Sequence, residues 1–198
     1  MSGNGSPAGE SSAAYSFRPS LLGAAREFRL TADAIEWSSG GKTGRIPFNT
    51  IRRVRMSYRP ASMQSQRYLT ELWAEGAPKL EIVSSSWKSI VEQERFDRPY
   101  SAFVTELNRR LAGAGGAIKF ECGSNPLLYW PGVAVFAAVG VALVLMFGRA
   151  VLDGVLGGAI IVAGFLALFL WQSGNFFRRN RPGTYRPDAP PAVLLPGS

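Results

Sequence analysis

The chain has 198 residues, with 22 Lys and Arg against 14 Asp and Glu, so its formal net charge is +8 at neutral pH. It contains no histidine and one cysteine, Cys122, which excludes an internal disulfide and removes the commonest metal ligand and general base. The basic balance favours acidic partners, either anionic lipid headgroups or nucleic acid. We therefore expect no metal, no cofactor and no enzymatic activity.

Residues 1–22 are rich in Gly, Ser and Ala and are predicted to form a disordered tail. They have neither a basic start nor an apolar core, so they are unlike a secretory signal peptide. The folded part that follows is accordingly expected in the cytoplasm.

Residues 23–113 are predicted to form a small α+β domain. Between residues 27 and 85, short alternations of apolar and polar residues indicate six antiparallel strands separated by turn sequences. Residues 87–96 carry no assignable pattern. The spacing then becomes that of one helix face, formed by Tyr100, Phe103, Val104, Leu107 and Leu111. The sequence predicts a bent antiparallel sheet capped by this C-terminal helix.

The layout of residues 26–112 resembles a bacterial pleckstrin-homology-like domain. The resemblance rests on the order of elements and on two stretches, Arg45-Ile46-Pro47-Phe48-Asn49-Thr50-Ile51 and Tyr100-Ser101-Ala102-Phe103-Val104-Thr105-Glu106-Leu107. It implies a strongly bent sheet of seven strands closed at one end by a helix. Phosphoinositide-binding members use spaced basic residues around the first hairpin, whereas this chain has a tight turn there with Asp33.

Seven basic residues lie between Trp37 and Thr70 without any carboxylate among them: Lys42, Arg45, Arg52, Arg53, Arg55, Arg59 and Arg67. If Val54 and Met56 face the core, Arg53, Arg55 and Arg59 share the opposite face of their strand. We predict that Arg45, Arg52, Arg53, Arg55, Arg59 and Arg67 bind anionic lipid headgroups or a partner, at ~1 kcal/mol per cation near a negative leaflet. The alternative is a solvated face whose arginines pair with glutamates from elsewhere. Nucleic-acid binding is not expected, because Tyr58 and Tyr68 are predicted to face the core.

Two short motifs suggest chemistry that their surroundings do not support. Gly40-Gly41-Lys42-Thr43 resembles the end of a phosphate-binding loop, but the next residues read as a strand, so a hairpin turn is predicted. Cys122 lies just before a long apolar run and has no histidine to activate it. It is interpreted as a packed thiol, with reversible acylation as the alternative.

After a linker at 114–125, the chain contains two apolar runs, residues 127–147 and 155–171, without a charge in either. At ~1.5 Å per residue, the first run spans the ~30 Å core of a bilayer. We predict membrane helices at 126–148 and 155–174, joined by a loop at 149–154. Pro131 suits the first turn of a helix, so the regular part of the first span is predicted to start near it.

Charge around the hairpin predicts its orientation. Arg178, Arg179 and Arg181 follow the second span, whereas Arg149 at the tip is offset by Asp153. Both termini are therefore expected in the cytoplasm of a bacterium, with the hairpin in the inner (plasma) membrane. Three aromatic residues are predicted to anchor the spans at the interface together with these arginines: Tyr129, Trp130 and Trp171.

Small residues recur every four positions in both spans, at Ala134, Ala138 and Ala142 and at Ala159, Ala163 and Ala167. Such stripes let helix backbones approach closely in lipid. We expect the stripes to face each other within the hairpin; the alternative is an interface with a second copy or another membrane protein. Neither span has a charge at mid-depth, so transport is not expected.

Residues 175–198 form a basic and then proline-rich tail, which is similar to tails of bacterial membrane proteins. It is predicted either to dock in a partner's groove or to lie on the domain. The sequence as a whole favours a non-enzymatic membrane protein whose domain binds lipid headgroups or a protein. The second hypothesis is an accessory subunit of a larger membrane complex, and the third is an enzyme, for which no complete catalytic set is present.

Overall fold

The computed structural model describes residues 13–20, 23–60, 66–87 and 93–196. The chain divides into two compact units, one of Met1–Phe120 with Tyr185–Ser198 and the other of Glu121–Thr184. The fold is mixed α+β with two long apolar helices toward the C-terminus, as the sequence predicts. The strands form sheets of four, five and two strands rather than the single bent sheet expected. The first unit is thus built from chain segments on both sides of the helix pair.

A four-stranded antiparallel sheet opens the first unit, in the order β1-β2-β3-β4. Its strands are β1 (Ala14–Phe17), β2 (Arg26–Leu30), β3 (Ala34–Ser39) and β4 (Lys42–Pro47). β1 lies within the predicted disordered tail, so that prediction is wrong for this stretch. Tyr15 and Phe17 alternate with polar neighbours and are buried against the core, with their rings 5.8 Å apart. This burial of two aromatic side chains holds β1 on the sheet.

The short 3-10 helix η1 (Phe48–Thr50) turns the chain into β5 (Ile51–Tyr58), which pairs antiparallel with β6 (Tyr68–Ala74). β7 (Leu80–Val83) pairs with the other side of β6. Alternate residues such as Val54, Met56 and Ile82 are fully buried, as expected for one face of a half-buried sheet. Residues 87–96, which carry no assignable pattern, contain β9 (Gln93–Arg95), and β9 pairs with β8 (Ser85–Trp87) just before that stretch.

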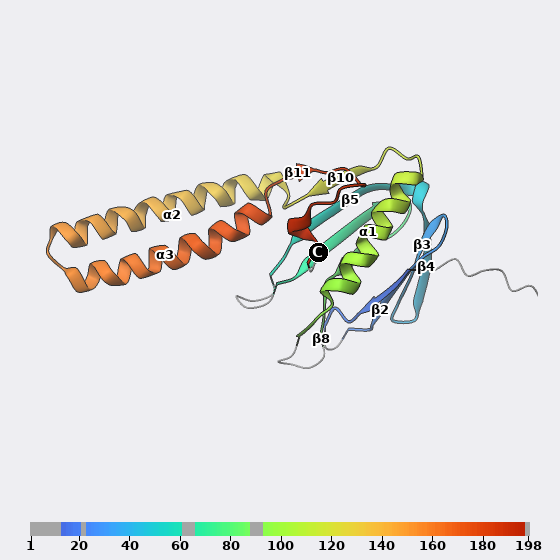
Figure 1. Cartoon of the computed structure of the whole chain (residues 1–198), viewed down its shortest axis with the longest axis horizontal. Coiled ribbons are helices and arrows are strands. Elements are labelled where there is room, and N and C mark those ends of the chain that lie inside the picture. Colours follow the sequence, from blue (N-terminus) through green and yellow to red (C-terminus); the bar gives the residue numbers. More distant parts are fainter. Residues whose placement is uncertain (1–12, 21–22, 61–65, 88–92, 197–198) are drawn as a thin grey trace, which may run out of the picture. The chain divides into compact units, whose positions relative to one another are not determined.

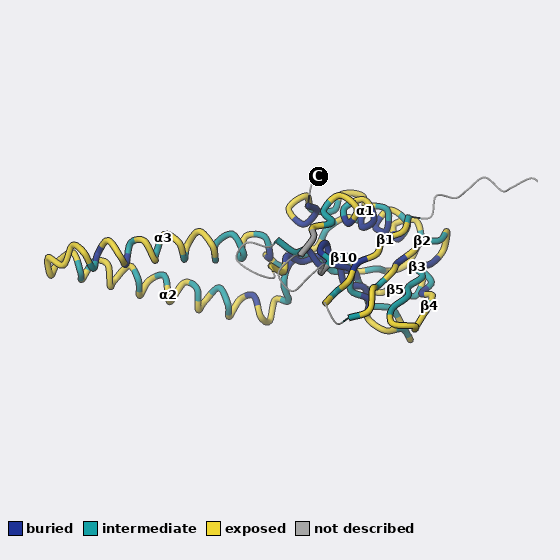
Figure 2. Tube along the Cα trace, turned by 90° about the horizontal axis from the view of Figure 1, so that it is seen from below, coloured by how far each residue is buried: buried dark blue, intermediate teal, exposed yellow. Residues whose placement is uncertain are grey.

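Helix α1 (Asp97–Gly113) lies over the sheets of the first unit and turns its buried side toward them (Figures 1 and 2). The five apolar residues of the predicted stripe are all buried, together with Asn108. The Tyr100 hydroxyl lies 2.7 Å from that of Thr70 on β6, which ties the helix to the sheet. Burial raises the pKa of Tyr100.

The C-terminal segment packs on the first unit, which is one of the two arrangements predicted for it. The Tyr185 hydroxyl donates to Oδ1 of Asn108 on α1 (2.9 Å), and Ser101 Oγ donates to the carbonyl of Pro196 (2.6 Å). The 3-10 helix η2 (Ala192–Leu194) contacts β5, and Leu194 is only 1% exposed. Residues after the helix pair therefore complete the core begun before it.

The second unit is a hairpin of two helices, α2 (Pro126–Leu152) and α3 (Leu156–Arg179). Asn125 caps α2 by accepting from the Leu127 N–H, so the helix begins five residues before Pro131. Asp153 caps the C-terminal end of α2 and accepts from Arg149 (3.0 Å), rather than lying in the first turn of the next helix. Gly154 provides the positive φ (71°) of the turn.

The base of the hairpin is fastened by backbone pairing. β10 (Lys119–Cys122) and β11 (Gly183–Thr184) run antiparallel, with Cys122 opposite Gly183. Gly123 (φ 80°) approaches the chain so closely that a Cβ there would lie 2.3 Å from the Arg181 carbonyl oxygen. The two ends of the hairpin are therefore held next to each other.

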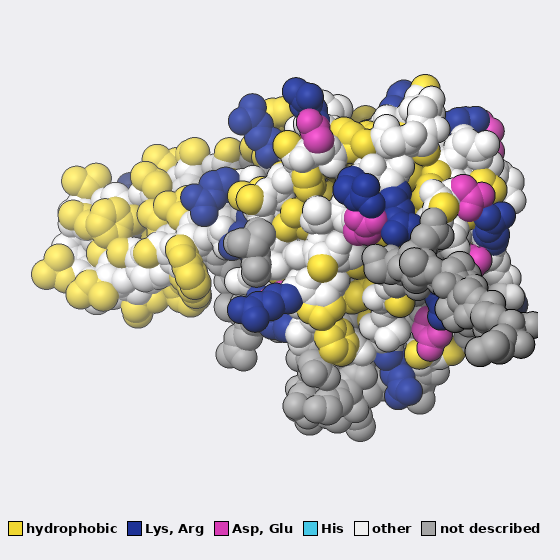
Figure 3. Space-filling view, turned by 45° about the vertical axis from the view of Figure 1, so that its right-hand side comes forward, with side chains coloured by type: hydrophobic (Ala, Val, Ile, Leu, Met, Phe, Trp, Pro, Cys, Tyr) yellow, Lys and Arg dark blue, Asp and Glu magenta, His cyan; other side chains and the backbone are white. Residues whose placement is uncertain are grey.

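Both helices are long and apolar enough to span a membrane. At ~1.5 Å per residue, the 27 residues of α2 extend about 40 Å, which exceeds the ~30 Å hydrocarbon core. Large apolar side chains such as Leu128 and Ile160 are exposed on their surfaces. Hydrophobic side chains accordingly cover the hairpin in Figure 3, a surface suited to lipid.

Candidate functional site

The predicted basic residues do not form one cluster. Arg45 on β4 donates to Asp33 (2.6 Å), and Arg52 at the start of β5 donates to Glu75 (2.8 Å). These hydrogen bonds lower the pKa of both carboxyls. Because the pairs are exposed, each contributes little to stability. For Arg45 and Arg52, the alternative prediction of pairing with distant carboxylates is therefore correct.

Arg53 and Arg55 instead gather around an indole. The guanidinium carbon of Arg53 lies 4.0 Å from the ring centroid of Trp73, that of Arg55 lies 5.6 Å away, and Lys79 Nζ lies 5.3 Å away. Strand pairing produces this arrangement, because Arg53 is the partner of Trp73 on β6. A cation over an indole face is attracted by the ring quadrupole. We call Arg53, Arg55, Trp73 and Lys79 the Trp73 surface.

Two carboxylates border the Trp73 surface. Lys79 Nζ donates to Glu71 (2.6 Å) and to Glu81 (2.7 Å), and these hydrogen bonds raise the pKa of Lys79. Glu71 is only 5% exposed and lies opposite both Arg55 and Glu81 in the sheet register. The three cations of the Trp73 surface and the two carboxylates that border it together carry a net charge of about +1.

Arg59 and Arg67 are not part of this surface and lie beyond the paired ends of β5 and β6. The Arg59 N–H donates to the Arg67 carbonyl (2.8 Å), and the Arg59 side chain is exposed. Arg67 is half-buried, and its Nε has no hydrogen-bond partner among the described residues. The prediction that Arg59 shares a strand face with Arg53 and Arg55 does not hold, since β5 ends at Tyr58.

Sequence reasoning missed Trp73 and Lys79. Leu72 faces the core, so the next residue, Trp73, lies on the outer face of β6. An aromatic residue on that face was a signal in the sequence for a binding surface. Lys79 precedes β7, and its approach to Trp73 depends on strand pairing that spacing alone does not reveal. The site therefore combines two predicted arginines with two residues brought in by the fold.

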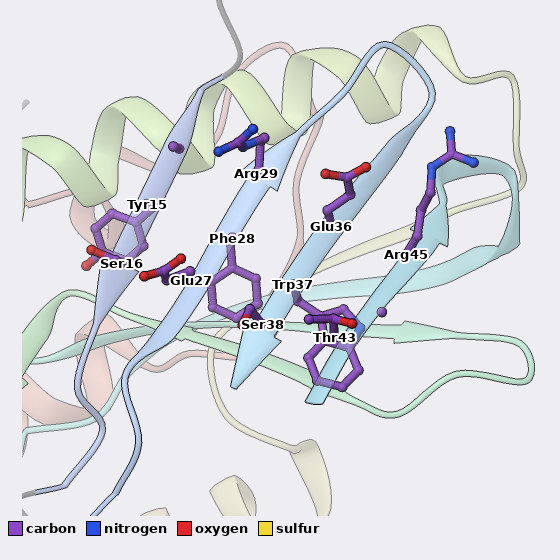
Figure 4. A pocket seen from close by; sticks show the side chains of 12 residues that line it. Tyr15, Ser16, Glu27, Phe28, Arg29, Glu36, Trp37, Ser38, Thr43 and Arg45 are labelled. Atoms are coloured by element: carbon purple, nitrogen blue, oxygen red, sulfur yellow. The ribbon is translucent and has the colours of Figure 1, made fainter. Parts of the chain in front are cut away.

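A second surface feature is a hollow of about 650 Å³ on the outer face of the four-stranded sheet (Figure 4). Arg29, Glu36 and Arg45 form one row across its strands, while Glu27 lies on the same face. Positive and negative side chains alternate along the row, so a ligand in the hollow would meet charges of both signs. The phosphate-loop motif nearby is a hairpin turn between β3 and β4, as predicted, with positive φ at its two glycines.

A group of ion pairs lies at the C-terminal half of α1. Glu106 accepts from Arg109 (2.6 Å) and Arg110 (2.6 Å), and these hydrogen bonds, that of Arg109 foremost, lower the pKa of Glu106 to about 2. Arg110 also donates to the Thr31 carbonyl (2.5 Å), which joins α1 to the turn between β2 and β3. We assign this group a structural role, since it connects two elements of the domain.

The predicted membrane anchors have different surroundings. Trp130 and Trp171 are 61% and 75% exposed, as lipid-facing anchors should be. Tyr129 is instead buried, its hydroxyl donating to the Phe177 carbonyl (3.2 Å), so it holds the two helices together. The basic anchors Arg178 and Arg181 are exposed, whereas Arg179 is half-buried.

The alanine stripes do not face each other. Ala134, Ala138 and Ala142 are all exposed, whereas the side of α2 that meets α3 carries Phe136, whose ring lies 4.9 Å from that of Phe169 and 5.2 Å from that of Phe177. On α3, exposure increases along the stripe from buried Ala159 through Ala163 to exposed Ala167. Aromatic packing sets the rotation of α2 and turns its small residues outward, so the favoured prediction is wrong for this helix.

Cys122 is half-buried, and burial raises the pKa of its thiol, which suits a packed rather than a reactive cysteine. Among the described residues, no three Asp, Glu or Cys side chains are grouped as metal ligands would be. Comparison of the chain with protein-family models, curated proteins and solved structures finds no match.

Proposed function

We propose that this chain is a non-enzymatic, two-pass protein of the bacterial inner membrane, whose cytoplasmic pleckstrin-homology-like domain is tethered by the hairpin and binds anionic lipid headgroups. The main support for this proposal is that the first unit is made of chain segments from both sides of the hairpin. Residues up to Phe120 and residues from Tyr185 onward pack into one domain, so both ends of the hairpin are attached to it. The hairpin is therefore an insertion between two segments of the domain.

The charges of the hairpin support a cytoplasmic domain. Arg178, Arg179 and Arg181 follow α3 at the base, while Arg149 at the tip is neutralised by Asp153 at 3.0 Å. Cytoplasmic flanks of membrane helices carry the excess of Lys and Arg. The base, and with it the domain, is therefore proposed to lie inside the cell.

The Trp73 surface is the proposed headgroup site. Its indole suits the membrane interface, and its cations suit a leaflet with anionic lipids. Glu71 and Glu81 reduce its charge, so we expect an affinity well below that of three isolated cations, near ~1 kcal/mol of net attraction. The tether compensates for weak binding, because it keeps the domain at high effective concentration near the bilayer.

Thermal unfolding of the full chain in neutral detergent tests this proposal. Added short-chain phosphatidylglycerol is expected to raise the melting temperature more than phosphatidylcholine does, since a ligand of the folded state stabilises it. The variant Arg53→Gln/Arg55→Gln/Lys79→Gln should lose part of this rise. A control, Arg18→Gln/Arg29→Gln/Arg98→Gln, removes the same charge from exposed positions elsewhere and should retain it. Equal rises in both variants would refute the site and favour a protein partner.

The outward stripe of Ala134, Ala138 and Ala142 supports a second candidate, an accessory subunit of a membrane complex. Small residues on a lipid-facing helix surface permit close packing with another helix. Purification in mild detergent followed by mass spectrometry should then recover a stoichiometric companion. Replacing the three alanines with leucine should remove it, whereas Val135→Leu and Val139→Leu should not. Recovery of the chain alone would count against this candidate.

A further inference from the structure

The C-terminal residues 185–196, which we call the strap, cross the surface of α1 and β5. Tyr185 and Ser101 make the two hydrogen bonds that join the strap to α1, at 2.9 and 2.6 Å. Asn108, which accepts the first of them, is fully buried and also donates to the Val104 carbonyl (2.8 Å). The helix therefore presents a buried polar group that the strap satisfies.

Apolar side chains fix the other end of the strap. Leu194 and Leu195 are 1% and 9% exposed, and Pro196 is buried, whereas neighbouring Val193 is 61% exposed. Two successive leucines and a proline thus occupy the surface that α1 and β5 provide. We call this surface, with Ser101 and Asn108 at its edge, the strap site.

The amino-acid composition of the strap resembles that of a peptide ligand more than that of a β-strand. Four of its twelve residues are proline, so a third of its positions have no backbone N–H for a β-ladder. Proline-rich segments are extended before they bind and lose little conformational entropy on docking. Its only regular element is the three-residue helix η2. None of its residues belongs to a strand of the two sheets.

The strap is anchored at its start. The Tyr185 N–H donates to the Phe120 carbonyl (3.1 Å), and β11, which precedes the strap, pairs with β10. Release of the residues after Tyr185 therefore leaves the pairing of β10 with β11 in place.

We propose that the strap is a peptide ligand bound in cis, and that the strap site accepts an extended leucine- and proline-containing segment of a partner protein once the strap is released. This goes beyond headgroup binding and does not depend on the Trp73 surface. The strap then acts as an autoinhibitory contact.

Cysteine labelling of the full chain in lipid nanodiscs tests the proposal, in a Cys122→Ser background. A hydrophilic maleimide should label Val193→Cys fastest and Leu194→Cys at least tenfold more slowly. Leu107→Cys, in the fully buried face of α1, should be at least tenfold slower again. Equal rates for Leu194→Cys and Leu107→Cys would mean that the strap opens only when the domain unfolds, which would overturn the proposal.

Competition with a free peptide is the second test of the proposal. A synthetic peptide of residues 185–196 should raise the labelling rate of Leu194→Cys severalfold, with half of the effect at about 1 mM or above, because the free peptide must match the ~mM effective concentration of the tethered strap. The same peptide with Leu194→Asp should have no effect, and one with Val193→Asp should act like the original. Absence of competition would overturn the proposal.

Cysteine is smaller than leucine, so the Leu194→Cys substitution itself changes the packing of the strap. A third measurement therefore keeps Leu194. A fluorophore attached to the Val193→Cys variant should lose anisotropy when the peptide displaces the strap. Unchanged anisotropy at saturating peptide would contradict release.

Discussion

Replacing Leu194 with alanine should destabilise the first unit, although this residue lies beyond both membrane helices. The side chain is 1% exposed, so the substitution removes fully buried carbons from the strap site. At about 0.8 kcal/mol per buried CH₂ group, the transfer cost is about 2 kcal/mol. Leucine-to-alanine substitutions in rigid cores cost ~2–5 kcal/mol because a cavity remains, but a chain segment near the C-terminus can settle into the space. We therefore expect about 2 kcal/mol, a factor of about 30 in the folded-to-unfolded ratio.

Pulse proteolysis of the full chain in detergent, across a urea series, measures this change. The protease cleaves unfolded domain, so the urea midpoint of the surviving band gives the free energy of unfolding of the first unit. Val193→Ala is the matched control, because its side chain is 61% exposed and should change stability by less than about 0.5 kcal/mol. Equal midpoints for Leu194→Ala and Val193→Ala would refute the conclusion that the strap completes the domain.

Three further predictions concern the domain core and its ion pairs, and each is measured by the same urea midpoint. Gly44→Ala should cost about 1–3 kcal/mol, because the new methyl would lie 2.6–2.8 Å from the Trp37 indole; a wild-type midpoint would show that the indole moves freely. Tyr100→Phe leaves the buried Thr70 hydroxyl without its 2.7 Å partner and should cost about 1–2 kcal/mol, which an unchanged midpoint would disprove. Glu106→Gln should cost about 1–2 kcal/mol above pH 5, after allowance for solvent screening. Since the folded-state pKa is lowered to about 2, this difference should vanish as the pH falls from 5 to 2, and a pH-independent difference would argue against the ion pairs.

Local periodicity was sufficient to predict the six strands β2 to β7, α1 and the two long helices. The stripe from Tyr100 to Leu111 is a helix because its period is 3.6, and its apolar side is buried in the structure. β1 was missed because its four residues follow a stretch rich in Ser and Ala, and only Tyr15 and Phe17 indicate a strand there. Two aromatic residues in alternation are a weak local signal, although their burial is decisive for the fold.

The parts that could not be predicted depend on contacts between distant residues. Trp73 becomes the centre of a cationic surface because strand pairing places Arg53 opposite it. Similarly, the alanine stripe of α2 faces outward because the packing of Phe136 against α3 sets the rotation of the helix. Spacing within one helix identifies a stripe, but it does not determine which stripe meets the neighbouring helix.

In the proposed topology, the hairpin crosses the membrane twice and returns the chain to the domain on the cytoplasmic side. Single cysteines at the tip and in the strap, in a Cys122→Ser background, test it directly in intact bacterial cells with a membrane-impermeant maleimide. Leu152→Cys, at a tip residue that is 86% exposed, should be labelled from outside, and Val193→Cys only after the cells are opened. Labelling of Val193→Cys in intact cells, or protection of Leu152→Cys until lysis, would contradict this topology.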